Sequence, residues 1–269
     1  MVSRWRVMVV LGSLVLLALA PAARAVAIYT SDGTWGADAF VQGSPSGDNY
    51  GASNGLVLKN GSPADTYARK AYLRFDLQSP GAGIIEATLS LVVQTNNGGG
   101  TDPNPKAFSV QVFGLLDSYA GVDNNTDGDV IDDGDIHDEF WPEAMIDWTS
   151  APGNVTTSGY SFNSYAALLG TLNVAASDVA GSLVTMASNQ ALVDFLNADT
   201  NGVVTFLLRR TGANAGGSNN LAFYSKEFTP GVTLDEPTLT ILTPEPCTLT
   251  LAAIGGLTLL ARRRRRSAH

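Results

Sequence analysis

The chain has 269 residues, a formal net charge of −9 at pH 7 and a single cysteine, Cys247. Residues 26–243 carry eight Lys and Arg against 24 Asp and Glu, so this part has a net charge of −16 and no disulfide. Such a balance disfavours a nucleic-acid or anionic-membrane partner, because phosphate contacts need clustered Lys and Arg. The segment is long enough for one sizeable domain with its own core.

The N-terminus has the three parts of a secretory signal peptide. Arg4 and Arg6 precede an apolar stretch, residues 7–19, and Ala23-Arg24-Ala25 supplies a small-x-small cleavage site. We therefore expect residues 1–25 to be removed on export.

Short apolar runs between turn clusters predict a series of β-strands. They lie at residues 38–42, 56–59, 69–77, 84–95, 108–115, 203–210, 221–225 and 238–242. Within 69–77, every second residue is apolar, which predicts that one face of this strand lies in the core. The runs 84–95 and 108–115 flank a Gly-rich turn, a pattern typical of a β-hairpin.

One helix is expected at residues 189–198. Ser188 can cap its N-terminus, and Leu192, Phe195 and Leu196 form an apolar stripe. The fold class is therefore all-β, a jelly-roll β-sandwich with one short helix. The sandwich is flanked by the signal peptide and by a C-terminal transmembrane sorting helix.

An acidic loop has the spacing of a calcium-binding loop. Oxygen-bearing side chains alternate from residue 123 to 129, with Gly128 at the sharp turn. Gly134 stands at the last liganding position of an EF-hand, so a neighbouring aspartate would have to supply that oxygen. The candidate calcium ligands are Asp123, Asn125, Asp127, Asp129, Asp132, Asp133 and Asp135. The alternative is a solvated acidic loop.

Basic residues on or beside the predicted strands form a second candidate site. A uronate polymer needs Arg or Lys to pair with its carboxylates, and an aromatic ring such as that of Tyr67 or Tyr72 to stack on a sugar. The candidate glycan-binding residues are Arg69, Tyr72, Arg74, Arg209 and Lys226. The alternative is that these cations form salt bridges with the excess aspartates on a half-buried sheet face.

The sequence offers little for catalysis. The histidines are His137 and His269, so a Ser-His-Asp arrangement has only His137 to work with outside the sorting segment, and H-E-x-x-H does not occur. A carboxylate-based polysaccharide lyase or glycoside hydrolase is the remaining enzymatic alternative, with Glu143 as its best candidate. We expect a protein that is not an enzyme.

The C-terminus resembles the PEP-CTERM sorting signal of Gram-negative bacteria. Pro244-Glu245-Pro246 is followed by the apolar residues 247–260 and by five arginines, 262–266. The resemblance implies export, transient retention in the inner membrane and processing by an exosortase. Sorting residues are Pro244, Glu245, Pro246, Arg262, Arg263 and Arg264. A single-span tail anchor is the alternative, although 14 helical residues span only about 21 Å of a hydrocarbon core of about 30 Å.

Residues 26–243 resemble DNRLRE-type domains. The motifs, in family order, are Asp38-Ala39-Phe40-Val41, Asn49-Tyr50-Gly51, Tyr72 to Leu77, Trp141-Pro142-Glu143, Asp147 to Pro152, Tyr224 to Glu227 and Pro237 to Leu239. Asp147 and Ser150 depart from the family pattern, and Trp148 and Pro152 can pack a long crossover loop against the sandwich.

The resemblance implies a jelly roll similar to carbohydrate-binding modules, some of which bind acidic polysaccharides such as alginate. The expected domains are therefore residues 1–25, 26–243 and 244–269. The expected function is that of an exported, non-catalytic surface or extracellular-matrix protein, structural or adhesive, which binds an acidic polysaccharide.

Overall fold

The structure is a computed structural model, in which residues 23–43, 47–60, 67–79, 81–96, 105–119, 140–159, 161–211, 220–228 and 235–244 are described. Residues 26–241 form one compact unit, and residues 1–25 and 242–269 are assigned to another. Most of the expected signal peptide, the acidic loop at 123–135 and all of the sorting segment after Pro244 lie outside the described residues. None of the helices in the described ranges is long and apolar enough to cross a membrane.

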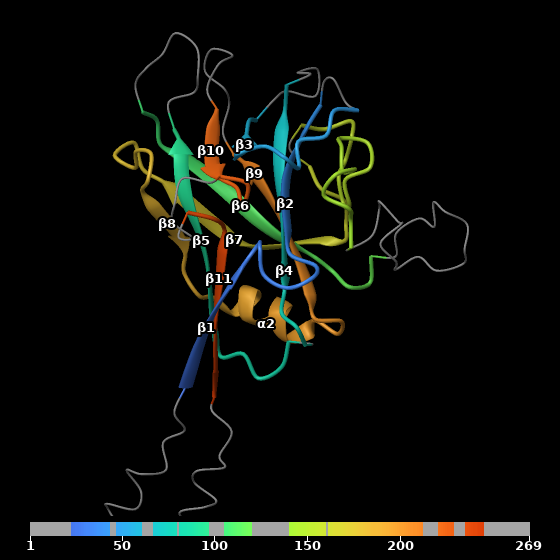
Figure 1. Cartoon of the computed structure of the whole chain (residues 1–269), viewed down its shortest axis with the longest axis vertical. Coiled ribbons are helices and arrows are strands. Elements are labelled where there is room, and N and C mark those ends of the chain that lie inside the picture. The colour runs from blue at the N-terminus through green and yellow to red at the C-terminus, as the bar shows by residue number, and fades with distance from the viewer. Residues whose placement is uncertain are drawn as a thin grey trace, which may run out of the picture. The chain divides into compact units, whose positions relative to one another are not determined.

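The described strands form two sheets (Figure 1). The strands are β1 (Ala23–Tyr29), β2 (Ala37–Gln42), β3 (Gly55–Leu58), β4 (Arg69–Asp76), β5 (Glu86–Thr95), β6 (Phe108–Leu115), β7 (Ala166–Val174), β8 (Leu183–Met186), β9 (Val203–Arg210), β10 (Leu221–Tyr224) and β11 (Thr238–Pro244). One sheet has the order β1-β11-β5-β10-β3, with β8 paired to β5, and the other has the order β2-β4-β9-β6-β7. Every pairing whose register is described is antiparallel.

The core lies between the two sheets. Alternate residues of β4, such as Leu73 and Phe75, meet alternate residues of β5, such as Leu89 and Leu91, in one apolar cluster. The period of two places successive side chains of a strand on opposite faces of its sheet. The expectation of a two-sheet β-sandwich is therefore confirmed, whereas the jelly-roll connectivity stays a prediction.

The five-stranded sheet is covered on its outer face as well. A long connection, residues 140–159 and 161–165 (here called the covering segment), lies beside β2 and β4 (Figure 1). Its residues Trp141, Ile146 and Trp148 pack with Tyr72 and Leu207 in a second apolar cluster. This cover explains why β2 is buried along its whole length and β4 along nearly all of it.

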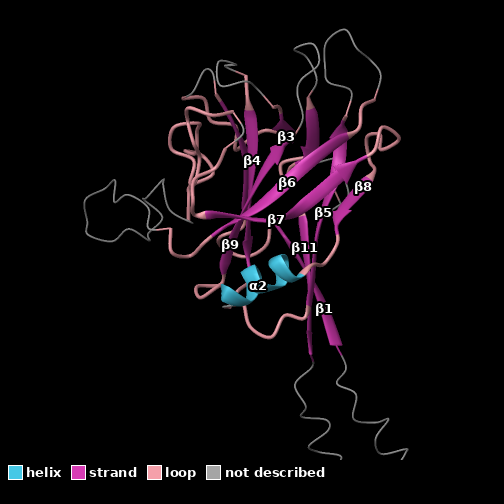
Figure 2. Cartoon of the chain, turned by 180° about the vertical axis from the view of Figure 1, so that it is seen from behind, coloured by secondary structure: helices cyan, strands magenta, loops and turns pink. Residues whose placement is uncertain are grey.

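The described part of the chain contains one helix, α2 (Gln190–Ala198), at one end of the sandwich (Figure 2). It buries Leu192, Phe195 and Leu196 as expected. The predicted cap at Ser188 is wrong, because the side chain of Asn189 accepts the hydrogen bond from the Leu192 amide at 3.0 Å. The Ser188 hydroxyl instead accepts one from the amide of Ala87 at 3.1 Å.

The predicted hairpin of residues 84–95 and 108–115 is also wrong. The strand β5 lies in the six-stranded sheet, whereas β6 lies in the other sheet between β9 and β7. Both strands send alternate residues into the same core, so the connection between them crosses from one sheet to the other. The sequence signals also missed the strands β1, β7 and β8.

Candidate functional site

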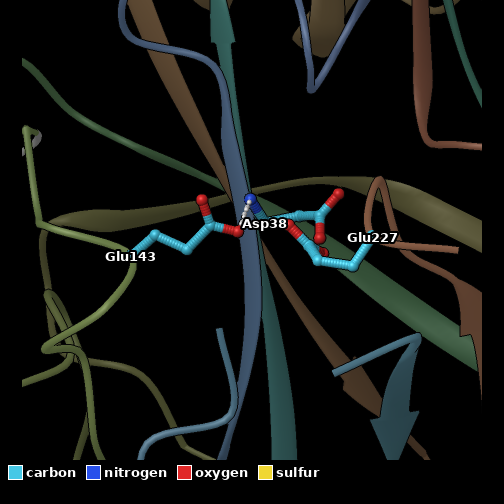
Figure 3. A group of neighbouring side chains, drawn as sticks. All are labelled: Asp38, Glu143 and Glu227. Atoms are coloured by element: carbon cyan, nitrogen blue, oxygen red, sulfur yellow. Dashed lines mark hydrogen bonds between the residues drawn. The ribbon is translucent and has the colours of Figure 1, made fainter. Parts of the chain in front are cut away.

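Three carboxylates from distant parts of the chain converge beside β2. Asp38 lies on β2, Glu143 on the covering segment and Glu227 on the turn after β10 (Figure 3). One carboxylate oxygen of each lies within 4.8 Å of the others. The Asp38 amide donates to Glu143 Oε1 at 3.4 Å, which ties β2 to the covering segment.

Asn49 and Gly51 hold Glu143 in place. The Asn49 side chain donates to the carbonyl oxygens of Glu143 and Ile146, at 2.8 Å each. Gly51 packs against the Glu143 backbone so closely that a Cβ atom there would overlap the Glu143 carbonyl oxygen. The Asn49-Tyr50-Gly51 motif is therefore a support for the covering segment.

Lys226 brings one positive charge to the carboxylates. Its Nζ lies 2.5 Å from Glu143 Oε2 and 3.6 Å from Glu227 Oε1. Its backbone amide donates to Asp38 Oδ2 at 3.0 Å, and the Thr30 hydroxyl donates to the same oxygen at 2.7 Å. Two buried oxygens, Asp38 Oδ1 and Glu227 Oε2, accept no hydrogen bond from any described residue.

Burial opposes ionisation of Asp38 and Glu143. It raises the pKa of Asp38 well above its usual value, and the nearby Glu227 adds to that rise. It also raises the pKa of Glu143 to about 7, against the opposing effect of Lys226. Burial alone would lower the pKa of Lys226, but the hydrogen bond to Glu143 and the surrounding carboxylates together raise it.

Two of the predicted glycan-binding residues lie beneath the covering segment. Tyr72 is 0 % exposed, and its ring meets Trp141 and Phe162 edge-on. Arg74 is 5 % exposed; its guanidinium donates to the carbonyl oxygens of Trp35 and Trp141 and lies 4.8 Å from the centroid of the Trp141 ring. Both side chains contact the covering segment, and both are too deeply buried to contact a polysaccharide.

Lys70 has a similar position. Its ammonium donates to Asn154 Oδ1 at 2.6 Å and to the carbonyl oxygens of Ser158 and Ser161 at 3.0 and 2.7 Å. It also lies 4.7 Å from the centroid of the Trp148 ring. The covering segment is thus held against β4 because its carbonyl oxygens and aromatic rings contact the cations Lys70 and Arg74. The expectation that Trp148 packs this long connection against the sandwich is confirmed.

Most of the cations, Lys70 included, lie toward one end of the sandwich. Of the eight Lys and Arg between residues 26 and 243, six lie where β4 and β6 begin and β3 and β9 end: Lys59, Arg69, Lys70, Lys106, Arg209 and Arg210. Lys59 and Arg69 pair through their backbones, and Arg209 pairs with Gln111. Arg69 and Arg209 are half-buried; Arg69 Nε donates to Gln42 Oε1 at 2.6 Å, and Arg209 Nε donates to Gln111 Oε1 at 2.8 Å. We call this the cationic end.

An exposed aromatic ring accompanies these cations. Tyr67 is 53 % exposed, and Lys59 Nζ lies 5.1 Å from the centroid of its ring. At the other end, beside α2, a hollow of about 440 Å³ is lined by apolar residues and by the acidic Asp117 and Asp194. The negative charge of these two aspartates would repel an anionic ligand from this hollow.

The predicted sites thus fall in different places. The five predicted glycan-binding residues divide between the cationic end (Arg69 and Arg209), the buried face of β4 (Tyr72 and Arg74) and the carboxylate cluster (Lys226). The calcium ligands predicted from Asp123 to Asp135, and the sorting residues after Pro244, lie outside the described residues. The cluster of Asp38, Glu143 and Glu227 was not predicted, although each residue belongs to a motif of the DNRLRE resemblance.

The two-sheet antiparallel β-sandwich fits the architecture expected of a carbohydrate-binding module. The family model of carbohydrate-binding module family 96 matches residues 29–169, just over half of the chain, and the chain belongs to this family. No curated protein matches the chain. Such modules typically bind carbohydrate and are non-catalytic.

Proposed function

We propose that the chain is a non-catalytic module that binds an acidic polysaccharide at the cationic end. The observation that carries the proposal is the gathering of six of eight cations at one end of a segment with a net charge of −16; Arg69, Lys106 and Arg209 are the three of them that are not buried. A polyuronate carries one carboxylate per sugar, and Arg pairs with carboxylates through two parallel hydrogen bonds. Arg69 and Arg209 are less buried than Arg210 at this end, and the exposed ring of Tyr67 offers a face for a sugar.

The test compares binding to a polyuronate with binding to a neutral glucan by titration calorimetry on the full chain. Arg69→Gln combined with Arg209→Gln should weaken polyuronate binding at least tenfold, and Tyr67→Ala should weaken it as well. Lys226→Met removes a positive charge away from this end, and Tyr72→Phe removes only a buried hydroxyl, so both should bind like the wild type. Affinity should fall with added salt, because surface charges are screened.

Equal affinity for the neutral glucan, without salt dependence, would overturn the proposal. Polysaccharide recovered from the same titrations should show no new reducing or unsaturated ends. New ends would favour the lyase or hydrolase alternative instead.

The proposal extends to the place of action. The signal-peptide pattern at residues 1–25 and the PEP-CTERM resemblance at residues 244–269 support export to the cell surface or extracellular matrix, where the module would act in a structural or adhesive role. In a Gram-negative host with an exosortase, the wild type should reach the cell surface or medium. A variant with Arg262 to Arg266 replaced by Gln should not be sorted in this way, and identical distribution of the two would count against this part of the proposal.

A further inference from the structure

We infer that Asp38, Glu143 and Glu227 form a calcium-binding site. It uses other residues than the cationic end and than the calcium ligands predicted at 123–135, and it does not depend on polysaccharide binding. The ion would join β2, the covering segment and the turn after β10 through one contact point.

The carboxylate cluster carries an excess of negative charge that a divalent cation would neutralise. Three ionised carboxylates and the ammonium of Lys226 have a net charge of −2, which one divalent ion would neutralise. Lys226 contacts Glu143 and Glu227, so it cannot by itself compensate all three carboxylates. Carboxylates placed this close repel each other unless a cation or a proton lies between them.

An unpartnered buried oxygen gives independent support. Asp38 is 1 % exposed, and its carboxylate lies between the side chains of Glu143 and Glu227 (Figure 3). Its Oδ2 accepts two hydrogen bonds, but Oδ1 accepts none from the described residues. The same holds for Glu227 Oε2. Leaving a buried carboxylate oxygen without a partner is costly, and coordination of a metal ion removes that cost.

The chemistry of the group favours calcium over other metals. All the donors are hard oxygens, whereas zinc and copper sites draw on His or Cys. Calcium binds oxygens at about 2.3–2.6 Å, so two of its ligands can lie up to about 5 Å apart; magnesium, at about 2.0–2.1 Å, allows only about 4.2 Å. The spacing of up to 4.8 Å within the cluster therefore suits calcium. Water would complete the shell of six to eight oxygens.

The experiment counts calcium ions bound to the full chain after chelator treatment, by titration calorimetry, and follows the melting temperature. The wild type should bind calcium and gain about 5–10 °C at a concentration a hundred times the Kd. Glu227→Gln and Asp38→Asn, which keep the shape of the side chain, should each lose one equivalent of calcium. Each variant should bind one calcium ion fewer than the wild type, even if the acidic loop at residues 123–135 binds a second ion. Asp194→Asn, at an exposed site on α2, is the matched control and should retain the full count.

A second variant tests the balance of charge. Lys226→Met removes the competing ammonium and should bind calcium more tightly, an effect that a merely structural role of Lys226 would not produce. The inference is overturned if the wild type shows no calcium-dependent melting shift. It is also overturned if Asp127→Asn abolishes all calcium binding while Glu227→Gln retains it, because the ion would then belong to the acidic loop. A wild-type melting temperature of Glu227→Gln in chelator would show that its fold is intact.

Discussion

Replacing Tyr72 with phenylalanine should stabilise the protein. The Tyr72 ring is fully buried beneath the covering segment, and its hydroxyl makes no hydrogen bond to any described residue. Burial also raises the pKa of this hydroxyl well above its usual value, so it stays protonated. Burying a hydroxyl without a partner costs about 1–3 kcal/mol, whereas the edge-on ring contacts to Trp141 and Phe162 are unchanged in Tyr72→Phe. We expect a gain of about 1 kcal/mol in the free energy of unfolding.

Calorimetry or fluorescence-detected melting would measure the effect, since 1 kcal/mol corresponds to about 2–4 °C in a domain of this size. Tyr50→Phe is the control. The Tyr50 hydroxyl lies 3.3 Å from Asp48 Oδ2 in an exposed hydrogen bond, so its loss should change stability by no more than about 0.5 kcal/mol. A fall in the melting temperature of Tyr72→Phe would refute the reasoning, because it would mean that the hydroxyl has a partner such as a buried water.

Two further substitutions test the contact of β4 with the covering segment and the contact of β6 with α2. Lys70→Met should lower the free energy of unfolding by about 2–4 kcal/mol at pH 7 in denaturant titrations, because three acceptors lose their charged donor. Burial lowers the pKa of Lys70 to about 7. The folded state therefore releases this proton at lower pH than the unfolded chain, and the wild type should gain stability relative to Lys70→Met from pH 7 to 10, by at most about 1.4 kcal/mol per pH unit. A constant difference over that range would contradict the assignment. Gly114→Ala should cost about 1–3 kcal/mol in thermal melts, because its Cβ would lie 2.5 Å from the Phe195 ring, whereas Gly47→Ala, with open space around it, should be neutral.

Local patterns in the sequence were enough to predict the sandwich. The alternation in β4 and the apolar runs of β5 and β9 follow from the period of a strand, and each was predicted at nearly its observed bounds. The strands that were missed lack this signal. In β7, Gly170 interrupts the run where the backbone packs against Met186.

The carboxylate cluster could not be predicted in the same way. The hydrogen bond from Asp38 to Glu143 spans 105 positions, and that from Lys226 to Asp38 spans 188, so no local spacing connects them. Alternation places Lys70 and Arg74 on the face of β4 away from the core, but a strand pattern cannot show that a distant segment folds over that face. The signal available was the set of acidic residues in otherwise separate motifs.

The order of the strands has a consequence for the timing of folding. Each of the last three strands to be synthesised is inserted between strands made earlier: β9 between β4 and β6, β10 between β5 and β3, and β11 between β1 and β5. Neither sheet can therefore close while the ribosome still holds the C-terminal part of the chain, and pairing over such long separations is slow. A chain released before Val203 would keep unpaired edges in both sheets and be prone to aggregation. In the proposed export of this chain, the same delay would keep the polypeptide unfolded during translocation.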